Sequence, residues 1–214
     1  MLQRLCDFSF SFIITVVIEL IYLFPYNYIK GWYTLDKKVQ EIFGKYHKSF
    51  KKKTYSEENN EYDVLMNVFN ISPELKRENR QYWGRELGML WQLIVTEICS
   101  HNCDNFQPAL RINNDEPVDL RIGNDAIDTK YRIGSGDSGT LKKFKQYGQM
   151  LRDLGYNPIL LILRTDNLPN AISACHKGGW TVLTGQAAFN YLYQKTGIDV
   201  EEYLEKYSNK YPIY

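Results

Sequence analysis

The length, charge balance and apolar content of the chain are typical of one folded domain that carries an extension. It has 214 residues, 26 Lys+Arg against 25 Asp+Glu, and 44% hydrophobic residues. These values exclude an intrinsically disordered chain, a collagen-like repeat and a uniformly basic histone-like binder, because each needs a very different composition. A nucleic-acid partner remains possible, since a local cluster of charge binds phosphates without a high net charge.

The first distinctive segment is a nearly continuous apolar run over residues 8–25. A transmembrane helix, a cleaved signal peptide and a buried helix of a soluble protein are the three interpretations. Glu19 opposes a transmembrane helix, because a central carboxylate costs about 2.5–3.5 kcal/mol on insertion scales. Bulky residues before Pro25 do not fit a signal cleavage site. We therefore favour a soluble, cytoplasmic protein in which this run is a buried helix or a dimer contact, with a membrane anchor as the alternative.

Two charged blocks follow the apolar run. Residues 37–53 carry seven lysines against Glu41, and residues 57–63 carry four carboxylates without a basic residue. Such blocks are usually solvated surfaces, and a basic arm that contacts phosphates is the alternative. We therefore expect an N-terminal extension over residues 1–70 and a separate folded domain over residues 71–214.

The second part of the chain alternates helical and extended patterns. Ser72 as N-cap and Pro73 in the first turn predict a helix, with or without a break, that runs to about Cys99. The predicted strands cover residues 108–112, 117–122, 126–133, 159–163 and 181–183, and the later helices cover residues 140–154, 168–177 and 185–195. The apolar run at 159–163 predicts a strand buried on both faces. This order predicts an α/β fold, with a three-stranded antiparallel hairpin sheet between two helices.

Two neighbouring predicted strands carry charged side chains that are segregated from the apolar ones. Side chains alternate along a strand, so Asp119 points away from its apolar neighbours, and Asp128 and Lys130 share one face of the next strand. A turn at residues 123–124 would set Asp119 opposite Asp128, whereas a turn at residues 124–125 would set it opposite Lys130. Either register gathers two carboxylates and an ammonium, and carboxylate oxygens suit a hard divalent ion such as Mg²⁺.

Lys130 beside such an ion would orient or deprotonate an attacking water, or neutralise a phosphate oxygen. A solvated hairpin whose charges only pair with one another is the alternative interpretation. The spacing of the two acids and the lysine is a weak pattern alone. The helix before it, and the glycine-rich loop, lysine-bearing helix and buried strand after it, strengthen the functional interpretation.

At these residues the chain resembles the PD-(D/E)xK nuclease superfamily, whose core is a helix, three antiparallel strands, a helix and a strand. Asp119 matches the first acid, Asp128 the second acid and Lys130 the lysine. The stretch over residues 130–148 is also similar to type II restriction endonucleases of the ApaLI-like family. The resemblance covers about residues 80–197. It implies a restriction-endonuclease-like fold, Mg²⁺ as cofactor, double-stranded DNA as substrate and a homodimer.

The chain departs from the superfamily pattern in two places. An additional valine separates the motif proline from Asp119, and the second acid, Asp128, is an aspartate rather than a glutamate. Many relatives add a glutamate from the preceding helix to the metal site. By this resemblance we favour Glu86 as a further catalytic residue, with Gln92 and Glu97 as alternatives, and an exposed helix glutamate is the other interpretation of Glu86.

Positive charge gathers after the motif. Between Lys130 and Arg152, six basic residues stand against Asp137 alone, which suits a phosphate backbone. Glycines at 134–139 allow close backbone approach to a phosphate. The predicted DNA-binding residues are Arg132, Ser135, Lys142, Lys143 and Lys145. A flexible linker followed by a solvated helix face is the alternative.

Other chemistries are less well supported by the sequence. Four cysteines without framework spacing indicate a reducing compartment and no structural disulfide, and a metal site at Cys99, His101 and Cys103 is a weak alternative. Gly178-Gly179-Trp180 predicts a turn and a core tryptophan. The predicted function is a Mg²⁺-dependent type II restriction endonuclease, and the alternative is a non-catalytic DNA-binding or membrane-tethered protein of the same fold.

Overall fold

The computed structural model describes most of the chain. The described residues are 31, 33–48, 62–134 and 138–214. The chain divides into two compact units, Met1–Gln40 and Glu41–Tyr214. Residues 33–48 are helical. The apolar run at 8–25 and Ser135 lie outside the described residues. No helix in the described ranges is long and apolar enough to cross a membrane.

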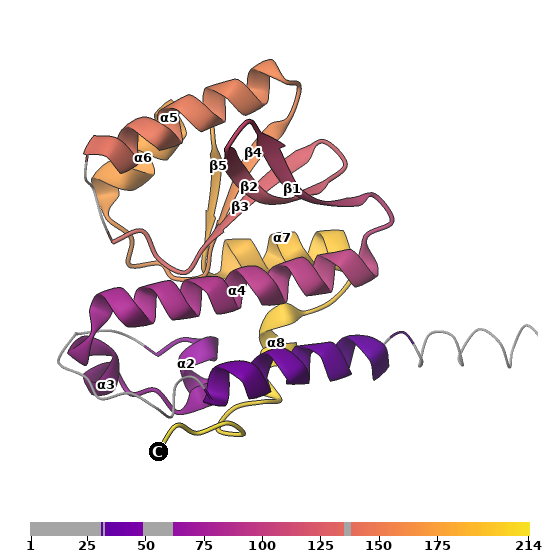
Figure 1. The fold of residues 1–214 in the computed structure, drawn as a ribbon, viewed down its shortest axis with the longest axis vertical. Helices are drawn as coiled ribbons and strands as arrows, with labels where there is room; N and C mark the ends of the chain where they lie inside the picture. The colour runs from indigo at the N-terminus through magenta and orange to yellow at the C-terminus, as the bar shows by residue number, and fades with distance from the viewer. Residues whose placement is uncertain (1–30, 32, 49–61, 135–137) are drawn as a thin grey trace, which may run out of the picture. The chain divides into compact units, whose positions relative to one another are not determined.

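A five-stranded mixed sheet forms the centre of the second unit (Figure 1). The strands lie in chain order across it: β1 (Phe106–Ile112), β2 (Asp115–Ile122), β3 (Asp125–Lys130), β4 (Asn157–Ile162) and β5 (Thr181–Thr184). β1, β2 and β3 pair antiparallel, and β4 and β5 continue parallel to β3. Parallel neighbours need crossover connections, which helices supply here.

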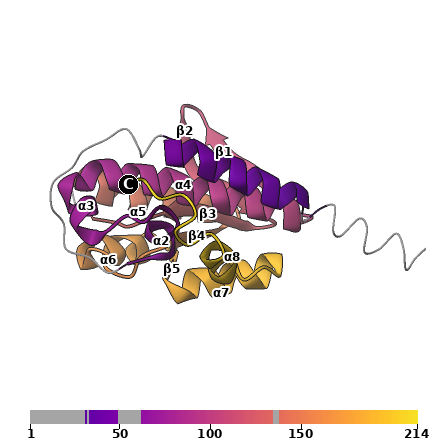
Figure 2. The ribbon, with the colours of Figure 1, turned by 90° about the horizontal axis from the view of Figure 1, so that it is seen from below.

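Helices cover both faces of this sheet. The helices described after residue 62 are α2 (Val64–Phe69), α3 (Pro73–Glu78), α4 (Arg80–Asn102), α5 (Ser138–Asp153), α6 (Pro169–Lys177), α7 (Gln186–Thr196) and α8 (Val200–Glu205), and four of them contact the sheet. α4 and α7 pack on one face, and the crossover helices α5 and α6 pack on the other (Figure 1). Figure 2 shows from below that α7 and α8 lie side by side. The predicted α/β fold with its central antiparallel hairpin sheet is confirmed.

Helix caps explain where the long predicted helix breaks. The side chain of Ser72 accepts a hydrogen bond from Leu75 N and caps α3, as predicted. Asn79 ends α3, and its side chain accepts a hydrogen bond from Tyr82 N, which starts α4. The predicted apolar stripe of α4 is buried, and its members are Leu87, Leu90, Trp91, Ile94, Val95 and Ile98. This stripe seats α4 on the sheet.

The structure differs from the predicted elements at one strand end and near the termini. β3 ends at Lys130 instead of residue 133, because the N–H of Ile133 donates to the side chain of Asn167 rather than to a strand. The sequence did not predict α2 or α8. These two helices contact each other, and the N–H groups of Tyr211 and Ile213 donate to carbonyls of α2. α2 therefore packs within the compact unit Glu41–Tyr214.

Candidate active site

The turn between β2 and β3 decides which charged side chains meet. Of the two registers compatible with the sequence, the structure has the first: Ile122 pairs with Asp125 around Gly123, whose φ is +57°. That backbone conformation suits glycine, which has no Cβ. Continued along the strands, this register sets Asp119 opposite Asp128.

The carboxylate of Asp119 is fixed on the neighbouring strand. Its Oδ2 accepts hydrogen bonds from the backbone N of Thr129 at 2.7 Å and from the hydroxyl of Thr129 at 2.6 Å. Thr129 is buried between the motif residues Asp128 and Lys130. A sequence pattern marks the motif acids but not this threonine, whose role depends on strand pairing. The two bonds hold the first acid beside the second.

The buried Asp128 forms an ion pair with the partly exposed Lys130. Lys130 Nζ donates to Asp128 Oδ1 at 2.5 Å and to the carbonyl of Thr129 at 3.2 Å. Burial and the charge of Asp119 raise the pKa of Asp128 to about 6, although Lys130 opposes the shift. Burial lowers the pKa of Lys130, but the carboxylates of Asp128 and Asp119 outweigh burial and leave that pKa above its ordinary value. Lys130 therefore keeps its proton at neutral pH.

These charges face the side of the sheet that α5 and α6 cover. Burial and the nearby charge of Asp128 raise the pKa of Cys175 on α6 to about 12. Asp125, three residues before Asp128, points to the opposite face. There it accepts a hydrogen bond from the hydroxyl of Tyr191 at 2.8 Å and pairs with Lys195 at 2.7 Å, both on α7. The alternation of side chains along β3 thus separates two acids with different roles.

The donor chemistry of the site suits a hard cation. Asp119, Asp128 and the carbonyl of Thr129 offer oxygens only, which is the ligand type that Mg²⁺ prefers. Within the described ranges, no group of three or more Asp, Glu, His or Cys residues gathers into a metal-binding cluster. A cation held here would therefore keep several water ligands, as Mg²⁺ usually does in proteins.

The structure does not bring the favoured helix glutamate to the carboxylate pair. Glu86 pairs with Arg85 at 3.1 Å on α4. Burial, with the charge of Glu86 as a second cause, raises the pKa of Tyr46 to about 12, so Glu86 lies near that phenol. Glu97 pairs with His101 at 3.3 Å, and Gln92 is half-buried on α4.

The predicted DNA-binding residues are not all in one place. Lys142, Lys143 and Lys145 are exposed on α5, beside the buried Phe144 that anchors the helix. Arg132 lies elsewhere, after the end of β3, and its Nε donates to the backbone carbonyl of Asp166 at 2.8 Å. The structure therefore offers an exposed row of lysines on α5 and a separate, anchored arginine next to the motif.

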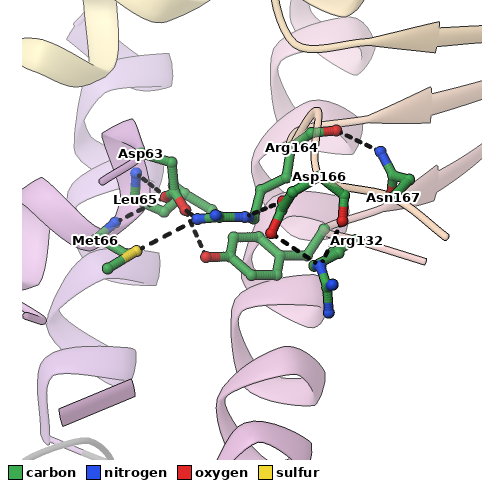
Figure 3. Close-up of polar contacts among 8 residues, drawn as sticks. Asp63, Leu65, Met66, Arg132, Arg164, Asp166 and Asn167 are labelled. Carbon is green, nitrogen blue, oxygen red and sulfur yellow. Dashed lines mark hydrogen bonds and ion pairs between the residues drawn. The ribbon is translucent and has the colours of Figure 1, made fainter. Parts of the chain in front are cut away.

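A polar network around the buried Arg164 follows the motif, and the sequence interpretation missed it (Figure 3). Arg164 is 5% exposed; its Nη1 donates to Asp63 at 2.9 Å and its Nε donates to Asp166 at 2.7 Å. Asp166 also pairs with Arg132 at 3.1 Å. The hydroxyl of Tyr131 donates to Asp63 at 2.5 Å. These five residues are called the Arg164 network below.

The Arg164 network is joined directly to the motif strand. The N–H of Leu163 donates to the carbonyl of Lys130, and the N–H of Arg164 donates to the carbonyl of Tyr131, each at 3.0 Å. A sequence signal for the network existed, because Arg164 directly follows the apolar run at 159–163, most of which forms β4. Charged residues at the carboxyl ends of adjacent parallel strands often line functional sites.

The comparisons with known proteins bear on this arrangement. Residues 33–209 match the sequence profile of the ApaLI-like restriction endonuclease family. The matched range includes Asp119, Asp128, Lys130 and the whole Arg164 network. No curated protein and no solved structure matched the chain. Because the profile matches most of its length, the chain belongs to the ApaLI-like restriction endonuclease family.

Proposed function

We propose that the chain is a Mg²⁺-dependent type II restriction endonuclease that hydrolyses phosphodiester bonds in double-stranded DNA at a short specific site. The observation that carries this proposal is the meeting of Asp119, Asp128 and Lys130 at neighbouring positions of two adjacent strands. Hydrolysis of a phosphodiester adds negative charge to a group that is already anionic. A site that combines oxygen ligands for a cation with a fixed ammonium supplies what that reaction needs.

Each side chain has a distinct role in this proposal. Asp119 and Asp128 would hold the cation together with the carbonyl of Thr129. Bound Mg²⁺ would supply Lewis acidity and lower the pKa of a water molecule. The raised pKa of Lys130 supports a role as a cation that stabilises developing phosphate charge, in preference to a role as general base. Its ion pair with Asp128 keeps the ammonium in position.

We also propose that two copies of the chain act together on one DNA site. The two strands of a duplex run in opposite directions, and a two-fold symmetric protein dimer matches that symmetry. The carboxylate pair of each chain would then cut one of the two DNA strands. Sedimentation of the protein with a duplex that carries its site should show two chains per duplex, and one chain per duplex would contradict this part of the proposal.

Plasmid cleavage tests the proposed function. Purified full-length protein is incubated with a fully sequenced plasmid and Mg²⁺, and the ends of the fragments are mapped. We expect ends that share one sequence, and no fragments when EDTA replaces Mg²⁺. Ca²⁺ should support DNA binding without efficient cleavage, because its looser coordination activates water less well.

Three variants connect that activity to the site. Asp119→Asn, Asp128→Asn and Lys130→Met should each lower the cleavage rate by at least about 100-fold, while duplex binding persists. Asp115→Asn, an exposed position on the same strand as Asp119, is the matched control and should cut at the wild-type rate. Efficient cleavage by an aspartate variant would contradict the site assignment. Binding without cleavage in any divalent ion would favour a non-catalytic DNA-binding protein.

A further inference from the structure

A groove with a cavity volume of about 390 Å³ opens beside the end of β3. Its lining includes Lys76 of α3, Arg80 of α4, and Tyr131, Arg132 and Gly134 from the segment after β3. Three of these residues are cations, and no Asp or Glu is among the described residues that line it. We call it the basic groove. Its charge indicates an anionic ligand.

Two of the three cations of the basic groove, Lys76 and Arg132, are held in place by the fold. Lys76 is 2% exposed, and its Nζ lies 4.6 Å from the ring centroid of Tyr131, a cation–π contact. Arg132 is tied through Nε to Asp166, which is itself held by the buried Arg164 (Figure 3). A Cβ at Gly134 would lie 2.7 Å from Arg132 Nη1, so the glycine leaves room for this guanidinium. Preorganised donors bind an anion at a lower entropic cost.

We propose that the basic groove binds a phosphate of the DNA backbone close to the bond that is cut. This inference rests on the proposed function, since it names a second contact of the same substrate. Arg132 follows Lys130 by two residues, just beyond the end of β3. The groove therefore lies next to the place where Lys130 would face the phosphate that is cut.

Phosphate fits this groove better than a base edge does. Guanidinium and ammonium groups only donate hydrogen bonds, and phosphate oxygens only accept them. A base edge presents donors as well as acceptors, which a set of cations does not complement fully. The contact is therefore expected to strengthen binding to every duplex and to hold the scissile strand in register beside Asp128.

Salt-dependent DNA binding tests the basic groove. Full-length protein in EDTA is titrated into two labelled duplexes, one with the mapped cleavage sequence and one without it, between about 50 and 200 mM salt. Arg80→Gln, at the exposed first residue of α4, should weaken binding to both duplexes about tenfold. It should also reduce the slope of log K against log salt by about 0.9. Arg80→Lys keeps the charge and should retain most of the slope.

The matched control is Arg85→Gln, an exposed arginine on the same helix that pairs with Glu86. It should leave the affinity and the slope unchanged. An unchanged slope for Arg80→Gln, or an equal loss for Arg85→Gln, would overturn the inference. A loss confined to the duplex with the cleavage sequence would do the same, because it indicates a base contact. If wild-type protein neither binds nor cuts DNA, the proposed function fails instead.

Discussion

At the scale of single residues, the buried carboxylate of Asp128 governs the pH dependence of the site. Burial, with the charge of Asp119, raises its pKa from the ordinary 3.8 to about 6 in the folded chain. Because the folded pKa lies above the unfolded one, Asp128 favours folding most when it is protonated. Its contribution to the free energy of unfolding therefore falls as the pH rises through about 6. A bound cation reverses that trend, since a ligand carboxylate must be deprotonated.

Metal-induced stabilisation should follow this titration. We expect Mg²⁺ to raise the Tm of the wild-type chain by several degrees at about pH 8 and by much less at about pH 5, where Asp128 holds a proton. Differential scanning fluorimetry measures the Tm shift at each pH, with NaCl at equal ionic strength as the reference. Asp128→Asn should lose the Mg²⁺-induced rise at both pH values. An equal rise at both pH values in the wild type would contradict the expectation.

Thr129 is a positioning residue, because it holds the carboxylate of Asp119 and does not itself contact DNA in the proposed site. Thr129→Val removes the hydroxyl that donates to the carboxylate but keeps the volume, and a hydrogen bond to a charged group contributes about 1.5–3 kcal/mol. We expect the Mg²⁺ concentration for half-maximal cleavage to rise about tenfold. Thr129→Ser keeps the donor and should restore most of the wild-type value. A loss of folding stability without a change in Mg²⁺ requirement would contradict a positioning role.

At the scale of elements, α5 and α6 meet through glycine. A Cβ at Gly148 would lie 2.6 Å from Nε1 of Trp180, and it would also clash with the carbonyl of Gly178. Trp180 is 3% exposed and donates to the carbonyl of Phe144 at 2.7 Å. The predicted turn and core tryptophan are thus confirmed. The contact of Gly148 with Gly178 and Trp180 packs the two crossover helices together on the face of the sheet that carries Asp128.

Adding a methyl group at this contact should destabilise the fold. We expect Gly148→Ala to lower the free energy of unfolding by about 1–3 kcal/mol, because the overpacking outweighs the better helix propensity of alanine. Gly44→Ala is the matched control in a helix where a Cβ would meet nothing within 4 Å. It should be neutral or stabilising by up to about 1 kcal/mol. Urea unfolding measures both variants, and similar midpoints would show that the contact accommodates a methyl group.

At the scale of the whole compact unit, the Arg164 network joins parts of the chain that lie far apart in sequence. Asp63 and Arg164 are 101 positions apart, and Tyr131 lies between them in the chain. The side chains of Arg164 and Asp63 are only 4% and 12% exposed. The network thereby fixes the end of β3, immediately after Lys130, against α2 and the end of β4. It also anchors Arg132 toward the basic groove.

Breaking this buried pair should cost more than breaking an exposed one. Arg164→Leu leaves the carboxylate of Asp63 buried without its guanidinium, and we expect a loss of about 3–5 kcal/mol in the free energy of unfolding. Arg111→Ala removes an ion pair of the same unit with Glu116, whose side chains are 80% and 49% exposed, and should cost less than about 1 kcal/mol. Chemical denaturation compares the two variants. Equal losses would show that the Arg164 network contributes no more to the free energy of unfolding than an exposed ion pair does.

The elements of the fold were largely predictable from the sequence, because they depend on neighbours within a few residues. The alternation of polar and apolar residues predicted β2 and β3, and the apolar run at 159–163 predicted β4. Ser72, as an N-cap, predicted the start of α3. The prediction that β3 extends to residue 133 was wrong, since the end of this strand depends on a hydrogen bond from the N–H of Ile133 to Asn167, 34 positions away. α2 was missed for a similar reason, because a short helix is stabilised mainly by what it packs against, here α8.

The order of helices and strands, the motif pattern of Asp119, Asp128 and Lys130, and the family resemblance could all be predicted from the sequence, since they depend on residue identity and local spacing. The hairpin register, the raised pKa of Asp128 and the contact of Asp119 with Thr129 could be found only in the folded chain. The tertiary structure alone brought together the members of the Arg164 network and of the basic groove. Burial and charge proximity arise from segments distant in the chain, so no local pattern encodes them.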